Sequence, residues 1–208
     1  MNYQNNKSAF YYTVRLVTRI ILTIFYSLKV KGAENVLGKG AYIIAANHIN
    51  WFDGFVLIAL FKKEIIFLSA ARLFERPLIR RAFLSRMGCI PVGQAQIRKA
   101  IKEALNILEK GGIIGIFPEG GVRLTKEMQE VKRGAFFLAH MTNVPIIPVG
   151  IQGTNDALLS RRKIPHHGEI VVNIGKPIYP EGTERETAEL VIAKITELMT
   201  CPAYPAYR

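Results

Sequence analysis

The sequence lacks the signatures of several protein classes. Only two of its 208 residues are cysteines, Cys89 and Cys201, and they form neither a CxxC pair nor a metal-ligand spacing. This favours a reducing compartment and argues against a disulfide scaffold, although a single disulfide stays open. Neither a P-loop nor GxGxxG occurs, and no serine lies in a GxSxG context. With 50% apolar and 21% charged residues, the chain is too apolar for disorder and long enough for one ordinary domain.

Acidic residues are scarce. Sixteen Asp and Glu stand against 28 Lys and Arg, which gives a formal charge of +12. Such a charge attracts polyanions: nucleic acid, an anionic bilayer, or an acidic substrate or carrier protein. Nucleic-acid binding would require aromatic residues interleaved with Lys and Arg on exposed strands, but here the aromatics cluster in apolar segments. We therefore expect an anionic membrane surface as a partner and no nucleic acid.

No apolar run of the N-terminal segment is long enough to cross a bilayer. Arg15 and Arg19 interrupt residues 8–30, which leaves only Ile20 to Leu28 uncharged, whereas about twenty apolar residues are needed. The segment also lacks the leading charge and the cleavage site of a secretory signal. We therefore expect a helix that does not span a membrane.

Helical periodicity divides this segment into two faces. One face is apolar and the other carries tyrosines, arginines and most polar residues, with Leu22 on the polar side. We predict an amphipathic helix within residues 1–29 that lies at the membrane interface of the cytoplasmic face, as in a peripheral, monotopic protein. The alternative is an ordinary amphipathic helix packed on the domain. The expected interface residues are Arg15, Arg19, Ile20, Ile21, Ile24 and Phe25.

The remainder alternates short apolar runs with helical stretches. We expect strands at 41–46, 64–70, 89–93, 112–117, 144–151 and 169–175, and helices at 51–61, 78–85, 94–109, 134–142 and 185–199. Strands separated by helices predict an α/β protein, a single layered domain over residues 30–208 with a largely parallel central sheet flanked by helices.

The segment NHINWFDG, residues 47–54, places His48 and Asp53 directly after the first of these strands. Positions i and i+5 lie about 140° apart on a straight helix, so the two meet only if His48 lies in the preceding loop. Asn50 is a good N-cap, which would put Asp53 at N3. Asp53 could simply stabilise the helix start, or it could orient His48 as a base. The carboxyl end of a strand is where open α/β sheets bind ligands, which favours the second interpretation.

A second loop, IFPEGGVR at residues 116–123, also follows a strand. Phe117 and Pro118 would anchor the turn, and Gly120 and Gly121 would let a ligand approach the backbone closely. Arg123 is a planar donor suited to phosphate. Alone, the loop is equally typical of a surface turn. Cys89, within an apolar strand, is interpreted as a small buried hydrophobe rather than a nucleophile.

The order of these motifs resembles the lysophosphatidate (1-acylglycerol-3-phosphate) acyltransferases. His-x4-Asp is followed by Phe-Pro-Glu-Gly and then by VPIIPVGI, and GCIPVG at residues 88–93 fits the family's second block. The third block departs from the usual F-P-E-G-T-R-S, since Gly121 and Val122 replace Thr-Arg and the arginine falls at Arg123. The second block ends in Gly93-Gln94 instead of a polar residue and arginine.

The resemblance implies the glycerolipid acyltransferase fold and a reaction. An acyl chain would pass from acyl-coenzyme A or acyl carrier protein to the sn-2 hydroxyl of lysophosphatidate, giving phosphatidate. His48 would act as the base and Asp53 would orient it, with no acyl-enzyme, metal ion or cofactor. The implied substrate-binding residues are Glu119, Gly120, Gly121, Arg123 and, in reserve, Lys132. Glycerol 3-phosphate or another lysolipid is an alternative acceptor, and a non-catalytic lipid-binding protein is an alternative function.

Overall fold

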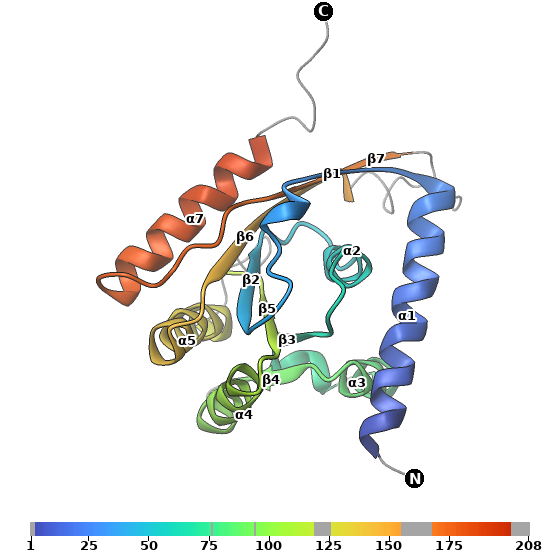
Figure 1. Cartoon of the computed structure of the whole chain (residues 1–208). Coiled ribbons are helices and arrows are strands. Elements are labelled where there is room, and N and C mark those ends of the chain that lie inside the picture. The colour runs from blue at the N-terminus through green and yellow to red at the C-terminus, as the bar shows by residue number, and fades with distance from the viewer. Residues whose placement is uncertain (1–2, 76, 94, 119–125, 155–167, 201–208) are drawn as a thin grey trace, which may run out of the picture.

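The computed structural model describes residues 3–75, 77–93, 95–118, 126–154 and 168–200, except for the side chains of residues 3–8 and 126–133 (Figure 1). In this part of the chain, seven strands form one sheet in the order β1-β7-β6-β2-β5-β3-β4. Every neighbouring pair is parallel except β6 and β7, which confirms the largely parallel sheet. The strands are β1 Tyr26–Lys31, β2 Tyr42–Ala46, β3 Ile65–Ala70, β4 Ile90–Val92, β5 Ile113–Ile116, β6 Ile146–Gln152 and β7 Gly168–Ile174.

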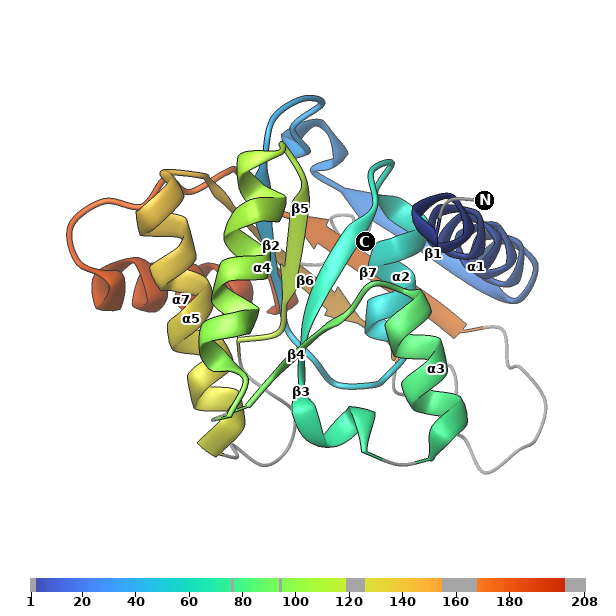
Figure 2. The same ribbon diagram turned by 90° about the horizontal axis from the view of Figure 1, so that it is seen from below.

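Helices cover both faces of the sheet. Figures 1 and 2 show α4, α5 and α7 on one face, and α1, α2 and α3 on the other. The expected α/β layers are therefore present. The helices are α1 Tyr3–Phe25, α2 Asp53–Leu60, α3 Leu78–Arg86, α4 Ile97–Glu109, α5 Lys126–Thr142 and α7 Glu184–Thr200, with short 3₁₀ turns at Ala33–Asn35 and Ala71–Phe74.

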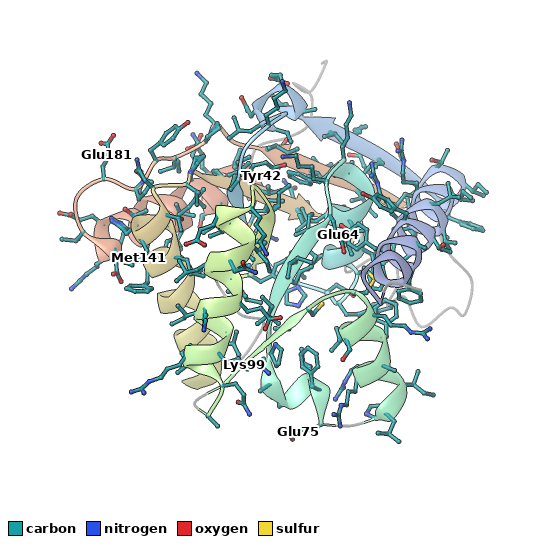
Figure 3. The ribbon with its side chains drawn as sticks, turned by 60° about the horizontal axis from the view of Figure 1, so that its bottom comes forward. Tyr42, Glu64, Glu75, Lys99, Met141 and Glu181 are labelled. Carbon is teal, nitrogen blue, oxygen red and sulfur yellow. The ribbon has the colours of Figure 1, made fainter. Side chains whose placement is uncertain are left out.

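Strand β2 lies at the centre of the sheet and divides two apolar cores. Alternate side chains of a strand point to opposite faces. Ile44 and Ala46 accordingly pack in the core under α1 and α2, whereas Ile43 and Ala45 pack under α4, α5 and α7. Figure 3 shows the same layering: Tyr42 of β2 lies inside, while Lys99 of α4 and Met141 of α5 lie on the outside. Because β2 is buried on both faces, the loop that follows it starts from a rigid base.

The N-terminal segment differs from the prediction in length. Helix α1 ends at Phe25, and residues 26–31 form edge strand β1, parallel to β7. Lys29 of β1 forms an ion pair with Glu169 of β7. The helical periodicity of residues 26–29 was therefore misleading, because backbone pairing with a strand far along the chain overrides a local pattern.

The face of α1 that packs on the domain includes residues of the predicted polar side. Tyr11, Thr18 and Leu22 are buried, and Tyr11 and Leu22 belong to the predicted polar side. The Tyr11 hydroxyl accepts a hydrogen bond from the Ile65 N–H at 2.9 Å, and Arg15 Nη1 donates to the Lys62 carbonyl at 2.7 Å. These polar side chains face inward because they satisfy backbone groups at the start of β3. Burial also raises the pKa of the Tyr11 hydroxyl, which keeps the phenol neutral.

The other side of α1 carries an exposed apolar stripe. Its members are 48–60% exposed: Leu16, Val17, Ile20 and Ile24. Arg19 is exposed as well, whereas Arg15, Ile21 and Phe25 are half-buried, with Ile21 and Phe25 packed against the core. Of the predicted interface residues, Arg19, Ile20 and Ile24 are thus available to a membrane, and Arg15, Ile21 and Phe25 face the domain. In the described residues, no helix combines the length and apolarity needed to cross a membrane.

We predict that Tyr11→Phe destabilises the protein, because it leaves the buried Ile65 N–H without its acceptor. The expected loss is about 1–3 kcal/mol in the free energy of unfolding. Urea unfolding followed by circular dichroism measures it. The matched control is Tyr12→Phe on the exposed side of α1, which should change stability by less than about 0.5 kcal/mol. Equal stability of the two variants would contradict the role given to the Tyr11 hydroxyl.

Candidate active site

His48 and Asp53 meet at the carboxyl end of β2. His48 lies in the loop after the strand, and Asp53 is the first residue of α2. The His48 Nδ1 atom lies 3.0 Å from Asp53 Oδ2. The loop reverses the chain between them, so the five-residue separation that a straight helix could not bridge is closed as predicted. The Asp53 side chain is fully buried, while that of His48 is 29% exposed, so the pair has a protected anchor and an accessible imidazole.

The turn between the two residues differs from the expected N-cap. The Asn50 carbonyl accepts from the Asp53 N–H at 3.0 Å, and Asn50 Oδ1 accepts from the Phe52 N–H at 3.1 Å. Asn50 therefore closes a tight turn before the helix instead of capping it, and Asp53 stands at the first helical position. The reason is that Asp53 itself binds the free backbone N–H groups of the turn.

Four donors surround the Asp53 carboxylate. Oδ2 accepts from His48 Nδ1, from the Ile49 N–H at 2.7 Å and from the Asn50 N–H at 2.8 Å. Oδ1 accepts from the Thr154 hydroxyl at 2.6 Å. An ionised carboxylate can only accept hydrogen bonds, so His48 carries its proton on Nδ1. The second imidazole nitrogen, Nε2, is then left with a lone pair that can take a proton from a substrate.

An aromatic stack holds the plane of the imidazole. The His48 ring stacks on Phe117 with 4.2 Å between centroids, and Phe117 stacks on Phe67 of β3 at 5.6 Å. Phe117 follows β5, the parallel neighbour of β2, so both loops leave the same edge of the sheet. The sequence suggested only that Phe117 anchors a turn; its contact with His48 depends on strand order, which no local pattern reveals.

The predicted substrate-binding residues fall largely outside the described part of the chain. Glu119, Gly120, Gly121 and Arg123 lie beyond residue 118, where the description of this loop ends. Lys132 lies within α5, but its side chain is not described. Phe117 and Pro118 are described, and the stacking of Phe117 brings the start of this loop to His48.

Two polar residues at the site were missed by sequence reasoning. Asn47 is fully buried and exchanges two hydrogen bonds with the backbone of Ile151, and Thr154 is the donor to Asp53. A signal for Asn47 was its place before His48. The signal for Thr154 was a polar side chain just past a buried strand, which is also common in turns.

Among the described residues, no group of three or more His, Cys, Asp or Glu side chains lies close enough to hold a metal ion.

The site is thus an imidazole held by a buried carboxylate at the carboxyl edge of the parallel strands of an α/β protein. A family model described as acyltransferase matches residues 27–152, which run from β1 to β6 and include both members of the pair. The chain belongs to the acyltransferase family.

Individual relatives agree with this assignment. The chain is 29% identical over 174 residues to the chloroplastic 1-acyl-sn-glycerol-3-phosphate acyltransferase BAT2 of Brassica napus, covering 81% of this chain and 50% of that protein. It is 27% identical over 183 residues to the 1-acyl-sn-glycerol-3-phosphate acyltransferase of Bacillus subtilis, covering 87% and 88%. The chain thus spans half the length of the plant relative and most of the bacterial one.

A solved structure shares the fold. The crystal structure of the 1-acyl-sn-glycerophosphate acyltransferase PlsC from Thermotoga maritima superposes with a TM-score of 0.66 at 20% identity, covering 96% of this chain and 84% of that one. The expected glycerolipid acyltransferase fold is thereby confirmed.

Cys89 lies near the aromatic stack but is unsuited to nucleophilic attack. Burial raises the pKa of its thiol to about 11. Since the thiolate is the nucleophile, a raised pKa suppresses reactivity at neutral pH. This agrees with its interpretation as a small buried hydrophobe, packed against the core.

We predict that Cys89 reacts slowly with iodoacetamide in the folded protein. At pH 8, a thiol with a pKa of about 11 is roughly 0.1% thiolate, against about a quarter for a free cysteine, so alkylation should be about 200-fold slower. Mass spectrometry of a Cys201→Ser variant, which leaves Cys89 as the sole cysteine, measures the rate. Urea should restore rapid alkylation. A fast reaction without urea would show that the thiol is activated.

Proposed function

We propose that this protein transfers an acyl chain from an acyl thioester to the sn-2 hydroxyl of 1-acylglycerol 3-phosphate, producing phosphatidate. The observation that carries the proposal is the hydrogen bond between His48 Nδ1 and the buried Asp53 carboxylate. Membership of the acyltransferase family and the names of the Brassica and Bacillus relatives support the same reaction. The donor would be acyl-coenzyme A or acyl carrier protein.

The chemistry follows from the orientation of the imidazole. With its proton on Nδ1, His48 would use Nε2 to take the proton of the acceptor hydroxyl as that oxygen attacks the thioester carbonyl. The negative Asp53 would stabilise the imidazolium that forms. When the tetrahedral intermediate collapses, the carbon–sulfur bond breaks and the Nε2 proton passes to the leaving thiolate. The new oxygen ester and the free thiol account for every atom without an acyl-enzyme.

The acceptor would be held by the loop that follows β5. Glu119 would orient the glycerol hydroxyl, and Gly120 and Gly121 would admit the ligand close to the backbone. Arg123 and Lys132 would bind the phosphate, because a guanidinium and an ammonium group both donate to phosphate oxygens. Support comes from Phe117, which precedes this loop and stacks on His48. A loop that starts beside His48 would bring an acceptor hydroxyl within reach of Nε2.

The altered second and third blocks favour a test of other acceptors. Val122 stands where the third block usually has arginine, and Gly93-Gln94 replace the polar residue and arginine of the second block. Both changes concern basic groups that could reach a phosphate. Glycerol 3-phosphate and other lysolipids are therefore the second candidates within the same chemistry.

We also propose that the protein works as a peripheral, monotopic enzyme on the cytoplasmic face of the cell membrane. The exposed stripe of α1, formed by Leu16, Val17, Ile20 and Ile24, supports this placement. Arg19 next to the stripe and the formal charge of +12 would attract anionic headgroups. The acceptor and the product both carry acyl chains, so a site held at the bilayer surface would receive and release them there.

We predict that His48→Ala lowers kcat for acyl transfer by about 100- to 10,000-fold, because the hydroxyl loses its general base. Asp53→Asn should also lower kcat, since a carboxamide has no charge to stabilise the imidazolium. Thiol release from acyl-coenzyme A or acyl carrier protein, dependent on lysophosphatidate, measures the rate. Parallel assays with glycerol 3-phosphate identify the acceptor.

The matched control is His140→Ala. His140 is hydrogen-bonded to Thr187 of α7 at 3.0 Å and lies on α5, so its loss should leave kcat nearly unchanged. Full activity of a folded His48→Ala variant would refute the mechanism. Wild-type protein that transfers no acyl group to any of these acceptors would refute the proposed function.

We predict that the double variant Ile20→Asp, Ile24→Asp binds anionic vesicles less tightly. Burial of an isoleucine side chain contributes about 1.5–3 kcal/mol, so losing two should weaken binding at least about 10-fold. Co-sedimentation with phosphatidylglycerol vesicles measures the bound fraction. Leu190→Asp is the matched control, because Leu190 is 57% exposed on α7, across the sheet from α1 (Figure 1). An equal effect of both changes would reject α1 as the membrane contact.

A further inference from the structure

We propose that Thr154 is a positioning residue for catalysis: its hydroxyl fixes the rotation of the Asp53 carboxylate and so aims the His48 imidazole. This inference rests on the proposed acyl transfer by His48. It adds a third member, contributed by a segment more than a hundred residues away, to the pair at residues 48 and 53.

The two oxygens of Asp53 have very different surroundings. Oδ2 receives three donors, all from residues 48–50, whereas the donor to Oδ1 is the Thr154 hydroxyl at 2.6 Å. Thr154 and Asp53 are both fully buried. The χ2 torsion of an aspartate has a broad minimum and does not fix the carboxylate by itself. A buried donor on the opposite oxygen restrains that torsion, and a missing donor would leave Oδ1 unsatisfied.

Two adjacent features of the fold position Thr154: the hydrogen bonds between Asn47 and Ile151, and the turn at Gly153. Asn47, next to His48, receives a hydrogen bond from the Ile151 N–H at 2.7 Å and donates one to the Ile151 carbonyl at 2.8 Å. This joins the end of β2 to the end of β6. Beyond it, Gly153 has φ +82°, and a Cβ there would lie 2.0 Å from the Glu169 carbonyl oxygen of β7. The turn thus requires glycine, and it places the next residue, Thr154, against Asp53.

The site is consequently held from both neighbours of β2. Thr154 reaches it from the β6 side and fixes the carboxylate; Phe117 reaches it from the β5 side and stacks on the imidazole. The Thr154 contact restrains rotation of the Asp53 carboxylate, and the Phe117 contact restrains rotation of the His48 ring. The Thr154 contact acts on the charge that stabilises the imidazolium, so its loss should lower the rate of the chemical step more than substrate binding.

The test compares Thr154→Val, which keeps the shape and removes the hydroxyl, with Thr154→Ser, which keeps the hydroxyl. We expect Thr154→Val to lower kcat about 10- to 100-fold with KM for both substrates within about 2-fold, and Thr154→Ser to retain kcat within about 3-fold. Thr18→Val is the matched control: Thr18 is also buried, but its hydroxyl donates to the Val14 carbonyl within α1. Thermal unfolding checks that each variant folds. If Thr154→Val does not fold, Thr154→Ala takes its place.

A second readout does not depend on turnover. In ¹⁵N spectra of the neutral imidazole, His48 should be protonated on Nδ1 in the wild type and should show a mixture of tautomers in Thr154→Val. A Thr154→Val variant with wild-type kcat and tautomer would overturn the proposal. So would a Thr154→Ser variant as impaired as Thr154→Val. If the wild type transfers no acyl group, the proposed function fails, and the tautomer comparison still decides whether Thr154 orients the pair.

Discussion

The buried negative charge of Asp53 is the constraint on which the geometry of this site depends. An ionised carboxylate removed from water is strongly destabilising unless hydrogen bonds and an opposite dipole or charge compensate it. Asp53 is fully buried and obtains that compensation from two backbone N–H groups, an imidazole and a hydroxyl. Its place in the first turn of α2 adds the favourable end of the helix dipole. The tight turn through Asn50 is the geometry that points both N–H groups at one oxygen.

The order of the strands makes further contacts with the pair possible. Strand β2 lies between β5 and β6, so the loops after all three strands leave one edge. One neighbour contributes Phe117 to the ring of His48, and the other contributes Thr154 to the carboxylate. The two residues of the local motif are thus fixed by segments that follow them by about 65 and 100 positions. The geometry of the pair is therefore set by the sheet, although His48 and Asp53 lie close in sequence.

The two faces of helix α1 differ in chemistry. Polar groups on the inner face, Tyr11 and Arg15, bind backbone atoms near the start of β3, and apolar groups on the outer face are left without cover in the described structure. In the proposed orientation, α1 lies between the domain and the bilayer. Hydrogen bonds hold its inner face on the domain, and Ile20 and Ile24 on its outer face would insert among the acyl chains. The distribution of polar and apolar groups on α1 thus accounts for its packing, and the proposed membrane contact uses the face that this packing leaves exposed.

The sequence alone determined the local features of this protein. Alternating apolar runs predicted the α/β layers and six of the strands, because strand and helix periodicities are local properties of the chain. The spacing of His48 and Asp53 just after a predicted strand identified the pair, and the motif order indicated the family. Only tertiary structure decided which face of α1 packs inward, since periodicity separates polar from apolar sides but does not say which one a neighbour will satisfy. It also decided that residues 26–31 form β1 on β7, and that Thr154 and Phe117 reach the pair. These contacts join residues far apart in the chain, and their partners exist only once the sheet has formed.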